Sequence, residues 1–321
     1  MKVPFVRTVL GDIAPAAMCV CYAHEHIIID ESYTTEKTPD FLLNDVEKAA
    51  AELRAFYACG GRCMIDSMPA DSGRNIVKLA EISRRSGVHI VCPTGLHLAK
   101  YYPHGHWARR FTDRQLADLF IADIKQGVDA NDYSSPLVER TGHKAGVIKI
   151  ASGLDGINDQ ERKLFAAAAM THHATGSPIL THTEQGTAAL EQIRLLADAG
   201  VALKHVCLSH TDRKPDVAYH RDILSTGVRI EFDSAFRWKA DQPNHTLNLL
   251  IKLLPEYPDQ IMLGMDAARA SYWKSYGGKP GLTFLLETFA PRLSAEGIPE
   301  ALLDKVFITT PADCYQFMPA R

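Results

Sequence analysis

Residues 146–151, Gly146-Val147-Ile148-Lys149-Ile150-Ala151, form an apolar run interrupted by one lysine. Apolar residues follow one another here instead of alternating with polar ones, which is typical of a strand buried on both faces of a parallel sheet. Seven further β-rich runs, each bounded by turn residues, lie at Cys19–Ala23, Arg62–Met68, Val88–Thr94, Pro178–Thr183, His205–His210, Val228–Asp233 and Ile261–Asp266. The eight runs recur about every 35 residues, which suits one strand-helix unit.

The segments between these runs have the periodicity of helices. Four of them are clear, at 45–58, 72–86, 162–175 and 187–199. We expect Asp71 to cap the second, and Gly200 follows the fourth, where a helix commonly ends. Eight alternating units predict an α/β fold, a closed (β/α)8 TIM barrel that occupies residues 1–321 as a single domain. An open, doubly wound sheet is the alternative, but the chain lacks the glycine-rich and P-loop motifs of nucleotide sites.

The composition excludes several classes of protein. Of the 321 residues 46% are hydrophobic, and 35 basic residues nearly balance 38 acidic ones, so neither disorder nor general binding to nucleic acid or anionic membranes is expected. The longest apolar run, Leu164–Met170, is too short to cross a bilayer, and Asp12 and Pro15 interrupt any N-terminal signal segment. Seven scattered cysteines are expected to be reduced thiols, and we predict a cytoplasmic protein.

Side chains that bind metals stand at the ends of several of the predicted strands. The first run leads into His24-Glu25-His26, where the alternation of a strand places both imidazoles on one side. The fifth ends in Thr181-His182-Thr183, the sixth in Ser209-His210 and the eighth in Met265-Asp266. The carboxyl ends of barrel strands meet at one rim, where barrel enzymes have their active sites. The pattern therefore predicts a metal centre.

Lys149 is the least expected member of this group. A lysine inside an apolar strand must lose its charge or find a partner, because an unpaired buried ammonium is costly. A neutral amine can react with carbon dioxide, and the resulting carbamate is an anionic ligand able to bridge two metal ions. The alternative is a lysine that reaches the rim or pairs with a nearby acid. The four histidines favour the carbamate.

At this point the sequence resembles the phosphotriesterase-like group of the amidohydrolase superfamily, over nearly its whole length. The motifs that carry the resemblance are His24-Glu25-His26, Gly60-Gly61-Arg62-Cys63-Met64-Ile65-Asp66, Gly73-Arg74-Asn75, Ile148-Lys149, Thr181-His182-Thr183, Ser209-His210 and Gly264-Met265-Asp266. The resemblance implies that His24, His26 and Asp266 hold the more buried of two metals. It also implies that His182 and His210 hold the other, and that carbamylated Lys149 bridges both together with a hydroxide.

The chemistry of such a centre is hydrolysis. Two divalent ions give a hydroxide at neutral pH and polarise a carbonyl or phosphoryl oxygen, so no organic cofactor is needed. Asp266 is expected to ligate and, through its free oxygen, to accept the proton of the attacking hydroxide. Zinc is the first choice of metal, and manganese and cobalt are alternatives.

The loops after the strands indicate the substrate. They are rich in cations and aromatic residues, which favours an anionic substrate. Our candidate substrate-binding residues are Arg269, Arg213, Lys274, Tyr276, His97 and Tyr101. The segment from Arg269 to Gly278 also resembles the branch of the family that opens phosphorylated sugar lactones.

We therefore expect a lactonase in which the hydroxide attacks the ester carbonyl of a phosphorylated sugar lactone. Three alternatives stay open at the same site: a phosphoester or phosphotriester hydrolase, an N-acyl amide hydrolase, and a non-catalytic barrel that only binds a ligand. We also expect a homodimer, as barrels of this kind often pair.

Overall fold

Lys149 lies in β7 (Val147–Ser152), and every residue of this strand is buried. The structure, a computed structural model, describes residues 3–154, 156–239 and 241–318. β7 pairs in parallel with β6 (Pro93–Gly95) and with β8 (Ile179–Thr183). Val147 packs inside the barrel, whereas Ile148 and Ile150 pack in the outer core. The strand is therefore buried on both faces, as the sequence predicts.

The strands follow one another around the barrel in sequence order. The remaining barrel strands are β3 (Cys21–Glu25), β4 (Cys63–Asp66), β5 (His89–Val91), β9 (Val206–Ser209), β10 (Arg229–Phe232) and β11 (Ile261–Leu263). They form the orders β3-β4-β5 and β6-β7-β8-β9-β10-β11. The backbone amides of Met265 and Asp266 donate to the carbonyl oxygen of His24, at 3.2 and 3.1 Å, and so join the end of β11 to β3. The result is a closed (β/α)8 barrel.

The eight predicted strands are confirmed to within three residues at each end. The third is interrupted at Cys92, between β5 and β6. Pro93 follows directly and has no backbone N–H to donate to the neighbouring strand, which accounts for a break that apolar content alone does not reveal.

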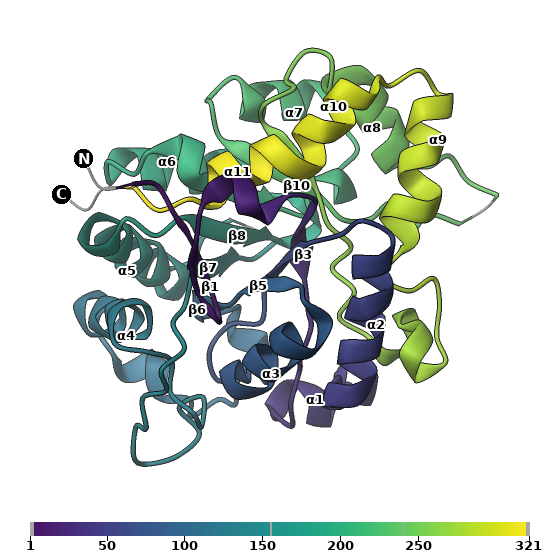
Figure 1. Ribbon diagram of the computed structural model, residues 1–321. Coiled ribbons are helices and arrows are strands. Elements are labelled where there is room, and N and C mark those ends of the chain that lie inside the picture. The colour runs from purple at the N-terminus through teal and green to yellow at the C-terminus, as the bar shows by residue number, and fades with distance from the viewer. Residues whose placement is uncertain (1–2, 155, 240, 319–321) are drawn as a thin grey trace.

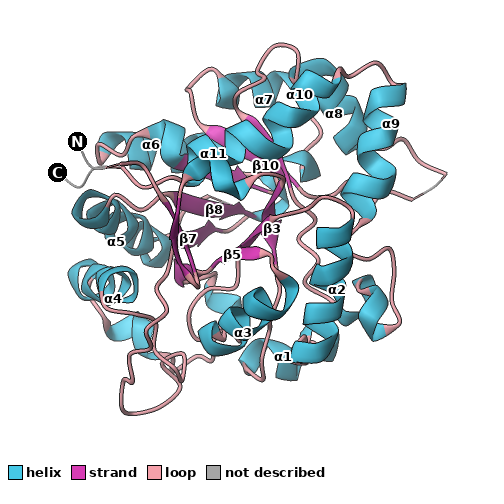
Figure 2. Cartoon of the chain, in the orientation of Figure 1, coloured by secondary structure: helices cyan, strands magenta, loops and turns pink. Residues whose placement is uncertain are grey.

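Helices surround the strands (Figures 1 and 2). They are α1 (Tyr33–Lys37), α2 (Val46–Ala58), α3 (Ile76–Ser86), α4 (Asp113–Lys125), α5 (Asp159–Thr175), α6 (Ala189–Asp198), α7 (Val217–Leu224), α8 (His245–Leu253), α9 (Ala290–Ala295), α10 (Glu300–Asp304) and α11 (Thr310–Tyr315). Two π-helical segments extend this last part of the chain, η10 (Leu285–Phe289) before α9 and η11 (Lys305–Thr309) between α10 and α11.

Short 3-10 helices lie in the loops. They are η1 (Pro15–Met18), η2 (Pro39–Phe41), η3 (Ala99–Tyr101), η4 (Trp107–Arg110), η5 (Glu184–Gly186), η6 (Leu203–His205), η7 (Thr211–Arg213), η8 (Ala270–Tyr272) and η9 (Lys274–Tyr276). Several of them follow the carboxyl ends of barrel strands and so border the predicted site.

The predicted cap at Asp71 is wrong. The helix begins at Ile76, and the side chain of Asn75 caps it by accepting a hydrogen bond of 2.9 Å from the amide of Lys78. Asp71 has a positive φ of 55°, whereas a capping residue needs an extended backbone. Its carboxylate instead accepts hydrogen bonds from the rings of His106 and Trp107.

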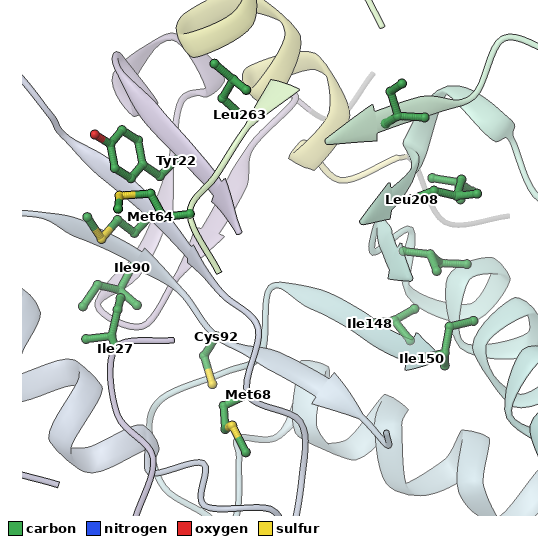
Figure 3. Packing of buried hydrophobic residues seen from close by; sticks show 14 of the residues in the cluster. Tyr22, Ile27, Met64, Met68, Ile90, Cys92, Ile148, Ile150, Leu208 and Leu263 are labelled. Atoms are coloured by element: carbon green, nitrogen blue, oxygen red, sulfur yellow. The ribbon is translucent and has the colours of Figure 1, made fainter. Parts of the chain in front are cut away.

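Apolar side chains fill both sides of the sheet. Outside, Tyr22, Met64, Ile90, Ile148 and Leu208 pack between strands and helices (Figure 3). Inside, small and medium residues close the lower half of the barrel: Cys21, Ala23, Cys63, Val91, Val147, Leu180, Cys207 and Met262.

The terminal helix closes the barrel floor from below. Cys314 and Tyr315 of α11 join the inner cluster, and the hydroxyl of Tyr315 donates to the carbonyl oxygen of Ala23 at 2.9 Å. The antiparallel hairpin of β1 (Val6–Thr8) and β2 (Gly11–Ile13) lies nearby, since Val6 belongs to the same cluster. With the floor filled, ligands can enter from the opposite rim.

The seven cysteines are unpaired in the structure, and five of them are buried, in agreement with the expected reduced thiols. Within the described ranges, no helix is long and apolar enough to cross a membrane.

Candidate metal centre

His24 and His26 both face the cavity at the carboxyl ends of the strands. β3 has a β-bulge between Tyr22 and Glu25, because three steps along β3 match two steps along β4 there. The extra residue lets Ala23 and His24 both point into the barrel although they are neighbours. The alternation of side chains along a strand correctly predicts that both imidazoles face the cavity, but it does not predict the bulge.

The residue between the histidines has a structural task. Glu25 is fully buried and accepts hydrogen bonds from the amides of Met265, at 2.8 Å, and Ala267, at 3.3 Å. It thereby fixes the backbone on both sides of Asp266 against β3. Burial raises the pKa of Glu25 well above its ordinary value.

Asp266 completes a three-ligand set with these histidines. Its Oδ1 atom lies 3.1 Å from Nε2 of His26 and 3.6 Å from Nε2 of His24. The three ligand atoms all lie within 4.8 Å of one another. Two imidazole nitrogens and one carboxylate oxygen are a donor set that suits zinc and other transition metals.

Lys149 lies next to this set, fully buried, and its Nζ atom has no hydrogen-bond partner among the described residues. Burial lowers its pKa to about 8, although the negative charge of Glu231 opposes the shift. The neutral form of this amine, which is the form that reacts with carbon dioxide, is therefore easier to reach than that of an exposed lysine. A buried amine without a hydrogen-bond partner, next to metal ligands, fits a side chain that would be carboxylated to a carbamate and would then bind metal.

His182 on β8 and His210 after β9 form the second pair. Their ring centroids are 4.5 Å apart, and the ring of His210 is 4.7 Å from that of His24. Glu184 contacts Nε2 of His182 at 3.0 Å, which leaves Nδ1 for a metal, whereas Asp233 contacts Nδ1 of His210 and leaves Nε2. Burial lowers the pKa of His182 to about 4 and also lowers that of His210, so both rings are neutral, as metal ligands must be.

The structure thus brings together all six residues that the sequence predicts as metal ligands, His24, His26, Lys149, His182, His210 and Asp266. They line one cavity of about 200 Å³ at the carboxyl ends of the strands. The two histidine pairs lie on either side of Lys149 in the strand order of the barrel, which suits two ions bridged by one ligand.

Four of the six predicted substrate-binding residues also line this cavity: Arg213, Arg269, His97 and Tyr101. Lys274 and Tyr276 do not. Nζ of Lys274 donates to Oγ1 of Thr283 at 3.1 Å, and the hydroxyl of Tyr276 accepts from the amide of Asp45 at 3.0 Å. Both residues belong to η9, which holds the loop against the outer helices, so the structure does not support their predicted contact with substrate.

Four residues of this region were missed in the sequence. Arg237 and Tyr272 line the cavity, and Glu231 and Asp233 lie directly behind the histidines. Glu231 could have been found from the sequence, because it is an acid within an apolar strand, just as Lys149 is a base within one. Arg237 lies in a cation-rich loop, but it is not close in sequence to a predicted ligand, as Arg213 and Arg269 are.

The carboxylate of Asp266 has no free oxygen. While Oδ1 faces the histidines, Oδ2 accepts hydrogen bonds from Arg213, at 2.6 Å, and Arg237, at 2.9 Å. Burial alone would raise the pKa of Asp266, but Arg237, His210, His26 and Arg213 together hold it well below its ordinary value. The expectation of a free oxygen that takes up a proton is therefore corrected, since two guanidinium groups occupy that oxygen.

The comparison with known proteins agrees with this geometry, because residues 4–315 match the phosphotriesterase family. The chain belongs to that family. A phospho-furanose lactonase of Mycoplasmopsis agalactiae is 34% identical over 100% of this chain and 94% of the relative. A crystal structure of an amidohydrolase from Mycoplasma synoviae has a TM-score of 0.96 and 30% identity, over 100% of this chain and 94% of that one. A lactonase from Listeria monocytogenes has a TM-score of 0.91 and 31% identity, over 98% and 100%.

Membership of the phosphotriesterase family and the ligand geometry together identify a metal-dependent hydrolase. The family also implies a pair of divalent ions, for which the six residues of the cavity supply ligands.

Proposed function

We propose that this member of the phosphotriesterase family opens the lactone ring of a phosphorylated furanose or a closely related anionic sugar lactone. One observation carries the proposal: three guanidinium groups, those of Arg213, Arg237 and Arg269, line the same small cavity as the six metal ligands. A phosphate is recognised by such groups, whereas a pocket for a neutral organophosphate would be mainly apolar. The relatives named as lactonases support the same choice.

The metal centre of the proposal holds two divalent ions, zinc first and manganese or cobalt as alternatives. His24, His26 and Asp266 would bind the more buried ion, His182 and His210 the other, and a carbamate on Lys149 would bridge them. When bound, the ions supply an activated water and polarise the carbonyl of the ester. The unpartnered Nζ atom of Lys149 is the feature of this chain that supports the carbamate.

Arg269 is the best placed group to bind the phosphate. Its side chain is 37% exposed, and its contact with Asp40 is long, at 3.4 Å, so its donors remain available to a ligand. The guanidinium also stacks on the ring of Phe41, with 4.6 Å to the centroid, which limits its orientations. Tyr272 lines the same cavity three residues further along.

His97 and Tyr101 also line the cavity, and the ring of His97 lies between those of Tyr101 and His182 in a series of contacts. The rings of His97 and His182 are 4.6 Å apart, and Nδ1 of His97 accepts a hydrogen bond of 2.7 Å from the amide of Leu98. The proton of the neutral ring is therefore on Nε2, which can donate to an ester oxygen of the substrate. Burial lowers the pKa of His97 well below its ordinary value, so the ring remains neutral.

The orientation of Asp266, a proposed metal ligand, is fixed by two arginines. Arg213 and Arg237 hold Oδ2, and this orients Oδ1 towards the histidines. Both arginines already donate hydrogen bonds to Asp266, so the phosphate of a substrate would compete with this carboxylate for their N–H groups. We expect Arg269 to make the first contact and Arg237 to follow.

The test compares matched substrates on protein loaded with zinc or manganese. Acid release from phosphorylated furanose lactones is measured with a pH indicator, beside the same lactones without phosphate, aryl phosphotriesters and N-acyl amides. About two metals per chain and preferential opening of the phosphorylated lactones are the expected results. Two metals with turnover of phosphoesters or amides only would replace the lactone by one of those substrates. Fewer than one metal, and no activity after loading, would favour a non-catalytic barrel.

We also propose a cytoplasmic location, which the seven unpaired cysteines support because reduced thiols are typical of that compartment. The homodimer stays a prediction.

A further inference from the structure

Glu231 is a buried acid that neither the metal-ligand set nor the substrate contacts use. It lies on β10, is fully inaccessible, and neither of its carboxylate oxygens has a hydrogen-bond partner of good geometry in the described part of the chain. A carboxylate in this condition costs several kcal/mol unless a nearby positive charge compensates it. Its position must therefore have a reason other than packing.

A predicted metal ligand lies in contact with Glu231. Oε1 of Glu231 lies 2.9 Å from Nδ1 of His24, and Oγ of Ser209 lies 2.9 Å from the same nitrogen. Nε2 of His24 is on the other edge of the ring, towards Asp266. Ser209 forms the hydrogen bond. Burial, together with the nearby Asp233, raises the pKa of Glu231 well above its ordinary value, so a cation bound at the metal site is needed to keep this acid ionised.

A neighbouring ligand shows the same arrangement. Asp233, two residues along from Glu231, contacts Nδ1 of His210. Glu231 lies on β10 and Asp233 directly follows that strand, and residues i and i+2 of an extended segment share one face. This segment therefore supplies one carboxylate to a histidine from β3 and another to the histidine that follows β9. These four residues form a compact, fully buried cluster whose ligand atoms lie within 4.8 Å of one another.

We propose that Glu231 is a positioning residue for the more buried metal. Its charge, acting with Ser209, keeps the proton of His24 on Nδ1 and directs the lone pair of Nε2 to the ion. The charge also makes the ring a better donor, as carboxylates behind metal-bound histidines do. The metal at the far edge of the ring in turn compensates the buried acid. This inference rests on the metal centre of the proposed function.

The test measures metal affinity, not turnover. Zinc affinity is determined by competition with a coloured chelator for the wild type, Glu231→Gln and Ser209→Ala. We expect Glu231→Gln to weaken one of the two ions about 10- to 100-fold and to leave the other within about threefold. The melting temperature of the metal-free protein should change little, because burial already favours the neutral acid in that state and the amide has nearly the same shape. A purely structural acid would show the reverse, a lower melting temperature with unchanged affinity.

Two controls separate positioning from a general loss of negative charge. Asp212→Asn removes another buried acid, which bonds to Ser234 and Thr246 and not to a metal ligand, and it should change affinity less than about threefold. The double variant Glu231→Gln/Ser209→Ala should lose more than the two single losses combined, because both residues act on one nitrogen. Additive losses, or an equal effect of Asp212→Asn, would overturn the proposal.

Two further results are informative. If Glu231→Gln does not fold, Glu231→Asp and Ser209→Ala are measured in its place, and unchanged affinity in both would overturn the inference. The stoichiometry and lactone activity of the wild type test the proposed function separately, since the ratio of variant to wild-type affinity does not depend on which substrate is cleaved.

Discussion

Arg213 donates a hydrogen bond of 2.6 Å to Oδ2 of Asp266 and a second one, of 3.1 Å, to Oδ1 of Asp233. One guanidinium group thus connects a predicted metal ligand with the carboxylate that contacts His210. The arrangement keeps Asp266 ionised and fixed in orientation. It also places a cation at the point where the bound substrate is expected to meet the metal centre.

Arg213→Ala should therefore change the acid side of the pH–rate profile. Loss of the guanidinium raises the pKa of Asp266 part of the way towards its ordinary value, because a neighbouring arginine lowers an aspartate pKa by about one to three units and Arg237, the larger contributor, remains. We expect the acidic limb of kcat/KM to move to higher pH by about one unit or more, with a lower plateau. Arg269→Ala is the matched control, since Arg269 lines the same cavity but contacts Asp40 instead of Asp266. If the acidic limb of kcat/KM is unchanged in Arg213→Ala, Arg213 does not help to keep Asp266 ionised.

Lys149→Ala should lose the metal centre. Without the amine no carbamate can form, so we expect loss of bound metal and of activity, with partial rescue by a short carboxylic acid that occupies the vacated space. Metal content by atomic absorption and the initial rate at increasing acid concentration are the measurements. Lys125→Ala, at the exposed end of α4, controls for the loss of a lysine elsewhere. Full metal content in Lys149→Ala would refute the bridging role.

The same lysine predicts how the stability of the metal-free, CO2-free protein depends on pH. Its pKa is about 8 in the folded state against 10.5 ordinarily, so between these values the unfolded chain binds more protons. Stability contributed by this group therefore rises as pH increases from about 8 to about 10, by at most about 1.4 kcal/mol per pH unit. Urea unfolding at several pH values measures it, and Lys149→Met should lack this rise. Parallel curves for the two proteins would show that Lys149 titrates normally.

The barrel and its ligands could be predicted because their signals are local. Lys149 within an apolar strand, and histidines at or just past the carboxyl ends of strands, are unusual enough in sequence to indicate a function. In a barrel the carboxyl ends of all strands meet at one rim, so these ligands come together whatever the loops between them do. The bulge between Tyr22 and Glu25 could not be predicted, since it depends on how β3 pairs with β4.

The loops could be predicted only as regions. Charge and aromatic content marked the loop after β11 as part of the site, but not which of its residues face inwards. The buried ring of Trp273, whose Nε1 donates to the carbonyl oxygen of Ala267 at 2.7 Å, fixes the loop and leaves Lys274 and Tyr276 on the outer side. That outcome depends on tertiary contacts with α2, which the loop sequence does not contain.

Tyr276→Phe tests this outer assignment. The substitution removes the hydroxyl that accepts a hydrogen bond from Asp45, so we expect a loss of about 1 kcal/mol in the free energy of unfolding. KM for the phosphorylated lactone should stay within about twofold, because the ring does not line the cavity. A large rise in KM at unchanged stability would instead return Tyr276 to the substrate site.

Arg269→Ala tests the phosphate contact itself. A hydrogen bond to a charged group contributes about 1.5–3 kcal/mol, so KM for phosphorylated lactones should rise about 10- to 100-fold with little change in kcat. The same lactones without phosphate should be hydrolysed as by the wild type, because they offer Arg269 no charge. Arg292→Ala, an exposed arginine of α9 outside the cavity, controls for overall charge. Steady-state kinetics on both substrates give the answer: equal losses on the two would mean that Arg269 supports the loop through Asp40 and Phe41 and does not bind the phosphate.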